Sequence, residues 1–267
     1  MAFDLSSIST AKQGRAPRIL LLGSHGIGKT EFAMSAPSPV FLPMKGEEGL
    51  DELPIQAFPL IESYSNIQEA LGTLAKGGHE HKTVVLDSAT TLAPLVEVEA
   101  MAREGVKSKA KLGGGWGHQW DTIRILWSNL RETFDWLRNN QNMITLIIGH
   151  VAIRPAREPG TESYDQWEFD IDKRVANDIM RWVDCILFMH HKIQVSISKG
   201  DFGKEEKKPY EIIEGQRWLF TEETATHPGK HRGFFRNLPS EIPLPKQNAW
   251  AAFMDVVKTS RSTMEVK

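Results

Sequence analysis

The sequence contains one cysteine, no long apolar run and almost no net charge. A single cysteine excludes a disulfide framework and fits a reducing compartment. Because Cys185 lies in the apolar segment VDCILFM, we expect its thiol to be buried. No apolar run reaches about 18 residues, so neither a transmembrane helix nor a membrane partner is expected. The first residues, MAFDLSSISTAKQGRAP, lack the basic start and apolar core of a secretory signal. We therefore expect a cytoplasmic protein.

The small net charge also restricts the partners of the chain. The formal charge is −2 over 267 residues, so the whole surface cannot act as a basic nucleic-acid-binding surface. Any binding of DNA or RNA has to come from local basic patches. The length suits one large domain, and no internal repeat is visible.

Apolar, strand-like segments alternate with helical segments in the first 190 residues. Strands are expected at 18–23, 39–44, 82–88, 143–150 and 183–189. One helix is expected at 65–78, with Ser65 and Gln68 as a capping box. A long helix is expected where apolar residues from Trp120 to Leu137 recur every three or four positions. This alternation predicts an α/β fold with a mostly parallel central sheet.

The pattern changes after residue 190. The segments HKIQVSIS and QRWLFTEE predict antiparallel strands added to the edge of the sheet, separated by the charged loop KGDFGKEEKKP. The segment NAWAAFMDVVK predicts a final helix.

The segment GSHGIGKT carries the strongest chemical signal. It fits the spacing G-x-x-x-x-G-K-[ST], directly after an apolar strand and directly before a helix. Backbone N–H groups in such a loop point at phosphate oxygens, the lysine reaches the β- and γ-phosphates, and the hydroxyl holds Mg²⁺. The motif therefore predicts ATP and Mg²⁺ as cofactors, bound by Gly23, Ser24, His25, Gly26, Ile27, Gly28, Lys29 and Thr30.

Two further acidic positions follow predicted strands. Asp87 ends the strand TVVLD, where a carboxylate can approach a bound metal ion, and it can equally cap the next helix. Glu47 and Glu48 follow the second strand, on the same edge of a parallel sheet. One of them can orient or deprotonate water, unless this segment is a solvated acidic turn.

Three segments together resemble the RecA/Rad51 family of recombinase cores: LDSATTLAPLVEVEA, GEEGLDEL and LIIGHVAIRP. The resemblance implies that Glu47, rather than Glu48, is the catalytic glutamate. It also implies that His150 occupies a polar sensor position, where RecA has an amide.

A closer resemblance is to the short, core-only RecA-like proteins of phages, some of which anneal single strands. It is carried by residues 163–188 and 217–245 and covers roughly 18–257. It implies an N-terminal arm at 1–17, one RecA-like ATPase domain at 18–257 and a flexible tail at 258–267. A phage protein would work in the cytoplasm of its bacterial host.

The segment KHR resembles an element that RecA-like hexameric motors insert into the active site of a neighbouring subunit. The resemblance implies that Lys230 and Arg232 stabilise the charge of the transition state in a homo-oligomer, as a ring or a filament. A solvated basic turn is the alternative.

Two segments combine basic with aromatic residues, as single-strand-binding loops do. The first is GVKSKAKLGGGWG and the second is VAIRPAREPGTESYDQWEFD, a glycine- and proline-containing segment expected to be a loop. Ordinary surface charge, with Trp167 in the core, remains an open alternative. The candidate DNA-binding residues are Lys107, Lys109, Lys111, Trp116, Arg154, Arg157 and Trp167.

These features lead us to expect a Mg²⁺-dependent, DNA-stimulated ATPase that binds single-stranded DNA in phage recombination or annealing, with a single-strand-binding protein as a candidate further partner. The alternative is a nucleotide-controlled assembly or motor ATPase that acts on a protein partner. A small-molecule kinase with the same phosphate loop is disfavoured by the KHR segment and by the lack of an evident lid.

Overall fold

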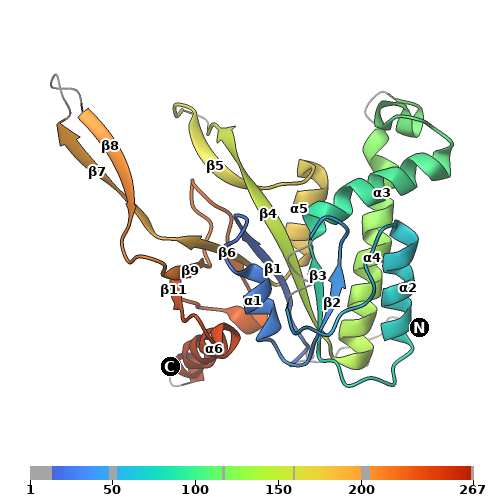
Figure 1. Cartoon of the computed structure of the whole chain (residues 1–267), viewed down its shortest axis with the longest axis horizontal. Helices are drawn as coiled ribbons and strands as arrows, with labels where there is room; N and C mark the ends of the chain where they lie inside the picture. The colour runs from blue at the N-terminus through green and yellow to red at the C-terminus, as the bar shows by residue number, and fades with distance from the viewer. Residues whose placement is uncertain (1–13, 48–52, 116–117, 159, 200–204, 266–267) are drawn as a thin grey trace, which may run out of the picture.

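A computed structural model describes residues 14–47, 53–115, 118–158, 160–199 and 205–265. The chain folds into three layers, with a central sheet covered by helices on both faces (Figure 1). On one face lie α2 (Tyr64–Ala75), α3 (Ala89–Glu104), α4 (Gln119–Gln141) and α5 (Lys173–Trp182). On the other face lie α1 (Lys29–Met34) and α6 (Ala249–Glu265).

Five parallel strands form the centre of the sheet, in the order β6, β1, β4, β3 and β2. Their bounds are β1 (Arg18–Gly23), β2 (Pro39–Pro43), β3 (Thr83–Asp87), β4 (Ile144–Ala156) and β6 (Cys185–His191). The α/β class and the mostly parallel sheet predicted from the sequence are therefore confirmed. Strand β4 lies between β1 and β3, and so between the strands that carry the phosphate loop and Asp87.

Antiparallel strands extend this sheet, as predicted for the C-terminal region. Strand β9 (Arg217–Phe220) pairs with β6, and β11 (Glu241–Leu244) pairs with β9. The short β10 (Lys230–His231) also pairs with β6. The second predicted DNA loop is not a loop, because β5 (Tyr164–Phe169) pairs with the outer half of β4 in a hairpin.

The prediction that HKIQVSIS joins the sheet edge is wrong. Strands β7 (Ile193–Lys199) and β8 (Glu205–Glu211) pair with each other in a separate two-stranded sheet. Residues 205–209, expected in a charged loop, belong to β8, while 200–204 lie outside the described residues. The sequence KEEKKPYE has little apolar content, so it lacks the apolar pattern from which a strand could be predicted.

Strand β1 shows why the middle of the sheet is fully buried. Ile19 and Leu21 belong to the apolar core under α1 and α6, whereas Leu20 and Leu22 belong to the core under α2, α3 and α4. Because successive strand residues point to opposite faces, a sheet covered on both faces needs a continuous apolar run. The sequence RILLLG supplies that run.

The structure corrects two helix boundaries. Ser63, rather than Ser65, caps α2, because its side chain accepts a hydrogen bond from Asn66 N. Helix α6 continues to Glu265, so residues 258–265 extend a helix instead of forming a separate tail. Of the predicted N-terminal arm, residues 1–13 lie outside the described residues, and Ala16 hydrogen-bonds with Arg138 and Asn142.

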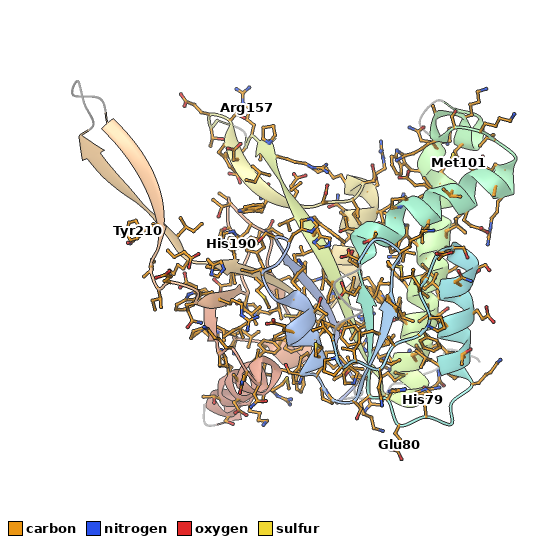
Figure 2. The ribbon with its side chains drawn as sticks, in the orientation of Figure 1. His79, Glu80, Met101, Arg157, His190 and Tyr210 are labelled. Carbon is orange, nitrogen blue, oxygen red and sulfur yellow. The ribbon has the colours of Figure 1, made fainter. Side chains whose placement is uncertain are left out.

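The parallel strands place their C-terminal ends at one edge of the sheet. The β4–β5 hairpin and the segment that contains η3 (Lys109–Gly114) lie at the same end of the molecule (Figures 1 and 2). In Figure 2, Arg157 and Met101 mark this end, and His79 and Glu80 mark the opposite end. Among the described residues, no helix has the length and apolar character needed to cross a bilayer.

Candidate active site

The phosphate loop connects β1 to α1 and depends on three glycines. Gly23 lies so close to β6 that an added Cβ would be 2.6 Å from Met189 O. Gly26 and Gly28 have φ angles of 72° and 92°, a left-handed conformation that other residues rarely adopt. Gly28 is also the N-cap of α1, with no side chain to satisfy the first N–H groups. The loop therefore leaves its backbone N–H groups available to an anion.

Lys29 is held inside this loop. Its side chain is mostly buried, and Nζ donates to Gly23 O at 2.9 Å and to Ser24 O at 2.8 Å. Nζ also lies 3.3 Å from Nδ1 of His150. Burial lowers the pKa of Lys29 to about 8, although the nearby carboxylates Asp87 and Glu47 oppose this shift. The ammonium group is therefore positioned in the site before any ligand arrives.

Thr30 and Asp87 form the candidate metal site. The Thr30 hydroxyl donates to Asp87 Oδ2 at 2.8 Å. Burial raises the pKa of Asp87 to about 6, and the hydrogen bond from Thr30 partly offsets this. The helix after β3 is capped by Ser88, whose side chain accepts from Thr91 N, so Asp87 does not serve as that cap.

Glu47 is the most strongly hydrogen-bonded carboxylate of the site. Its Oε1 accepts from Ser88 Oγ at 2.7 Å, Thr91 Oγ1 at 2.6 Å and His150 Nε2 at 2.9 Å. Burial favours protonation, but these hydrogen bonds outweigh it and lower the pKa of Glu47 to about 2. No described residue donates to Oε2. The carboxylate is therefore ionised and is held in place through Oε1. Glu48 lies outside the described residues.

His150 connects these parts. It lies on β4, is mostly buried, and its backbone N–H donates to Thr90 Oγ1 at 2.9 Å. Its ring bridges Lys29 and Glu47. The ring also stacks on His25 of the phosphate loop.

The residues present fit a Mg²⁺-bound nucleotide. Among the described residues, the backbone N–H groups of His25, Gly26 and Ile27 donate to no protein acceptor. Thr30 and Asp87 offer the oxygen ligands that Mg²⁺ prefers. In the described part of the chain, no group of three or more His, Cys, Asp or Glu residues could hold a metal ion.

Arg217 is a site-adjacent residue that the sequence did not indicate. It lies on β9, and its Nη1 donates to Glu31 Oε2 at 2.6 Å. An added Cβ at Gly28 would be 2.0 Å from the same nitrogen. Nη2 lies 3.3 Å from the carbonyl oxygens of Pro245 and Lys246. Arg217 therefore ties the C-terminal strands to the phosphate loop, through contacts that join residues nearly 190 positions apart.

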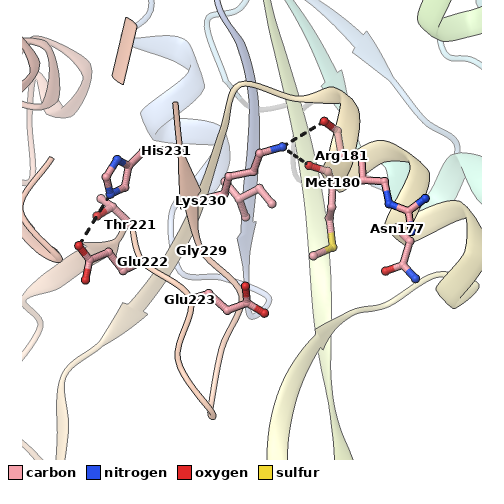
Figure 3. Close-up of a pocket in the computed structure, with 10 residues that line it drawn as sticks. Asn177, Met180, Arg181, Thr221, Glu222, Glu223, Gly229, Lys230 and His231 are labelled. Atoms are coloured by element: carbon pink, nitrogen blue, oxygen red, sulfur yellow. Dashed lines mark hydrogen bonds and ion pairs between the residues drawn. The ribbon is translucent and has the colours of Figure 1, made fainter. Parts of the chain in front are cut away.

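Lys230 and Arg232 lie away from the phosphate loop of their own chain. Strand β10 pairs with Cys185 and Ile186 at the start of β6, whereas the phosphate loop lies at the far end of the parallel strands. Lys230 Nζ donates to the carbonyl oxygens of three residues at the end of α5, two of which Figure 3 shows. Arg232 is 47% exposed and donates to Trp182 O at 3.0 Å.

A pocket of about 530 Å³ lies beside Lys230 (Figure 3). Its lining carries both signs of charge, with Lys230 and Arg181 against Glu222 and Glu223. It lies at the start of β6, so it is not part of the phosphate-loop site.

The candidate DNA residues of the first segment lie around η3. Lys107 and Lys111 are exposed and make no ion pair with the described residues, whereas Lys109 pairs with Glu97 and lies over the ring of Trp120. Trp116 lies outside the described residues.

The candidate DNA residues of the second segment lie on the β4–β5 hairpin. Arg154 pairs with Asp170, and Arg157 is exposed near the tip of the hairpin (Figure 2). Trp167 is half-buried and packs against Phe188 and His190, with ring centroids 6.2 and 5.5 Å apart. The structure therefore places Trp167 against the core, as the alternative interpretation expected.

The family model of an AAA domain matches residues 15–233, which is most of the chain. The chain belongs to this AAA domain family. Membership, together with the phosphate loop, confirms the coarser prediction of a P-loop ATPase that binds ATP and Mg²⁺. Among solved structures, the crystal structure of the RadB recombinase matches with a TM-score of 0.39 and 15% sequence identity, over 76% of this chain and 90% of that chain. No curated protein sequence matches this AAA domain.

Proposed function

We propose that this AAA domain hydrolyses ATP and couples hydrolysis to binding of single-stranded DNA. Lys29, Thr30 and Asp87 would hold the nucleotide phosphates and Mg²⁺. The nucleotide would supply the phosphoryl group, and Mg²⁺ would compensate its negative charge. Glu47 orients the attacking water through Oε2 and accepts its proton, while His150 keeps Oε1 in place. These five side chains meet at one edge of the sheet, which supports hydrolysis rather than nucleotide binding alone.

The continuity of β4 carries the link to DNA. This strand runs unbroken from Ile144 to Ala156, so His150 in the site and Arg154 in the hairpin belong to one element. We propose that a displacement of His150 is passed along this strand to the β4–β5 hairpin. The hairpin and the segment that contains η3 lie at the end of the molecule toward which the parallel strands point (Figure 1). The sequence resembles short RecA-like phage proteins, some of which anneal single strands, and we therefore propose a role in recombination or annealing.

A neighbouring copy is proposed to complete the site. Among the described residues, no arginine contacts Lys29, Asp87 or Glu47, although an arginine supplied to the γ-phosphate can speed such reactions by about 10³-fold or more. Arg232 is exposed at the opposite end of the sheet, where it can reach a second subunit in a ring or filament.

One observation favours a protein partner as the second candidate. The hairpin segment 151–169 holds two basic residues, Arg154 and Arg157, against four acidic residues, Glu158, Glu162, Asp165 and Glu168. This balance disfavours phosphate binding at the hairpin and suits a basic or polar protein surface. In that case ATP hydrolysis drives an assembly or motor function.

The experiment that separates the two measures ATP hydrolysis with and without single-stranded oligonucleotides. We expect single-stranded DNA to stimulate ATP hydrolysis. When Lys107 and Lys111 are both replaced by alanine, we expect the protein to bind DNA more weakly, with a salt dependence reduced by about two charges. Lys76, at the end of α2, and Lys258, in the middle of α6, are also exposed and provide a double-alanine control. Absence of DNA binding by an active ATPase would refute the DNA proposal and favour the protein partner.

A further inference from the structure

Two histidines from different elements stack in the active site. The rings of His25, in the phosphate loop, and His150, on β4, have centroids 3.8 Å apart and an interplanar angle of 14°. His25 is exposed, whereas His150 is buried beneath it. The phosphate-loop pattern G-x-x-x-x-G-K-[ST] allows any residue at position 25, so ATP binding alone does not require an aromatic ring there.

The neighbours of His150 determine which ring nitrogen carries its proton. A lysine ammonium only donates hydrogen bonds, so Nδ1 of His150 accepts from Lys29 at 3.3 Å. A carboxylate only accepts, so Nε2 donates to Glu47 Oε1 at 2.9 Å. The His150 ring therefore works in its neutral form, and it has to lie in one plane to meet both partners.

His25 provides the ring contact that fixes that plane. The other groups around the imidazole pair are Lys29 from α1, Glu47 after β2 and Asp170 after β5. Burial, followed by the charges of His150 and Lys29, lowers the pKa of His25 below its usual value. The lowered pKa favours the uncharged form of His25, which can lie face to face with the His150 ring without repulsion between two cations.

We propose that His25 is a positioning residue for hydrolysis, because its ring holds the His150 imidazole in the orientation that joins Lys29 to Glu47. The phosphate loop is therefore connected to Glu47 through His150 in two ways, by the contact of Lys29 with His150 and by the stack of His25 on His150. A loop conformation that moves His25 therefore releases His150 and, through it, the carboxylate. This inference rests on the proposed role of Glu47 in hydrolysis and adds a residue that regulates its position.

The kinetic test compares His25→Ala with His25→Phe. Alanine removes the stacked ring, so we expect kcat to fall about tenfold with KM for ATP changed less than about threefold, because the ground-state contacts to the phosphates remain. Phenylalanine restores a flat ring, so kcat should return to within about twofold of wild type. His81→Ala removes a histidine far from the site and serves as the matched control. A wild-type kcat in His25→Ala, or equal losses in both His25 variants, would overturn the proposal.

A spectroscopic test is independent of turnover. In the wild type, the ring protons of His25 should be shifted upfield by the His150 ring, and His150→Ala should remove that shift. Unchanged His25 resonances in His150→Ala would show that the rings do not stack and would overturn the inference. A different result would refute the proposed function: a wild-type protein that does not hydrolyse ATP, either with or without DNA.

Discussion

Replacing Lys230 by methionine tests whether this residue supports the fold or acts in a neighbouring active site. The Lys230 ammonium donates to the carbonyl oxygens of Met180 at 2.6 Å, Arg181 at 3.1 Å and Val183 at 2.9 Å. These carbonyls lie in the last turn of α5 and just beyond it, where backbone acceptors lack helical partners and a cation is favourable. Methionine keeps most of the length of the side chain and removes the donors.

The three contacts allow a rough magnitude. A hydrogen bond to a charged group contributes about 1.5–3 kcal/mol when buried. Lys230 is only half-buried and one ammonium serves all three acceptors, so we expect a net loss of about 2 kcal/mol in the free energy of unfolding. For a chain of this size that lowers Tm by about 4–8 °C. Arg232 makes one such bond and an ion pair with Asp184 at 3.5 Å, and its side chain is 47% exposed, so Arg232→Met should cost less than about 1 kcal/mol.

Thermal unfolding and ATP turnover, measured on both variants, separate the roles. We expect Lys230→Met to lower Tm, and Arg232→Met to keep its Tm and lose turnover. Mixing Arg232→Met with Lys29→Ala should restore activity above the sum of the two, provided that labelled subunits are shown to exchange. An unchanged Tm in Lys230→Met would refute its assignment as a cap of α5. Full activity of Arg232→Met alone would remove Arg232 from catalysis.

Three further predictions concern single side chains. Lys29→Ala should abolish ATP hydrolysis in a steady-state assay, because the β- and γ-phosphates lose their cation; turnover at the wild-type rate would contradict the site. Glu47→Gln should keep nucleotide binding and lose turnover, since an amide cannot accept the proton of water, whereas Glu48→Gln should have a milder effect. A larger loss of turnover in Glu48→Gln, measured by single-turnover kinetics, would transfer the role to Glu48. Trp167→Ala should lower the free energy of unfolding by about 2 kcal/mol, from lost packing against half-buried rings, and change DNA affinity little; unchanged chemical denaturation would contradict the packing.

The sequence predicted the chemical centre because each part of it is local. The segment GSHGIGKT specifies both the loop and its ligand, since glycine freedom, a lysine and a hydroxyl all follow one strand. Asp87 and Glu47 could be placed near it because parallel strands bring their C-terminal ends to one edge. The sequence leaves open whether Trp167 packs in the core or contacts DNA, because its segment is expected to be a loop and a loop has no periodicity that separates a buried from an exposed face.

The remaining features depend on contacts between distant segments. Arg217 reaches the phosphate loop through the order of the antiparallel strands, which no spacing in the sequence encodes. The His25–His150 stack depends on β4 lying next to β1, a neighbour relation that alternation of strands and helices does not specify. The sequence does not predict strand β8, because EEKKPYE is almost entirely charged and lacks the alternation of apolar and polar residues that indicates a half-buried strand.

The separate β7–β8 hairpin has a consequence for how the chain opens. Its strands pair with each other and not with the nine-stranded sheet. Isolated two-stranded hairpins are marginally stable in water, so their hydrogen bonds open with a small fraction of the free energy needed to unfold a domain. Backbone amides of β7 and β8 should therefore exchange with solvent deuterium well before those of β1 and β4. Slowing of that exchange, residue by residue, would report contact of a second molecule with this hairpin while the core remains unchanged.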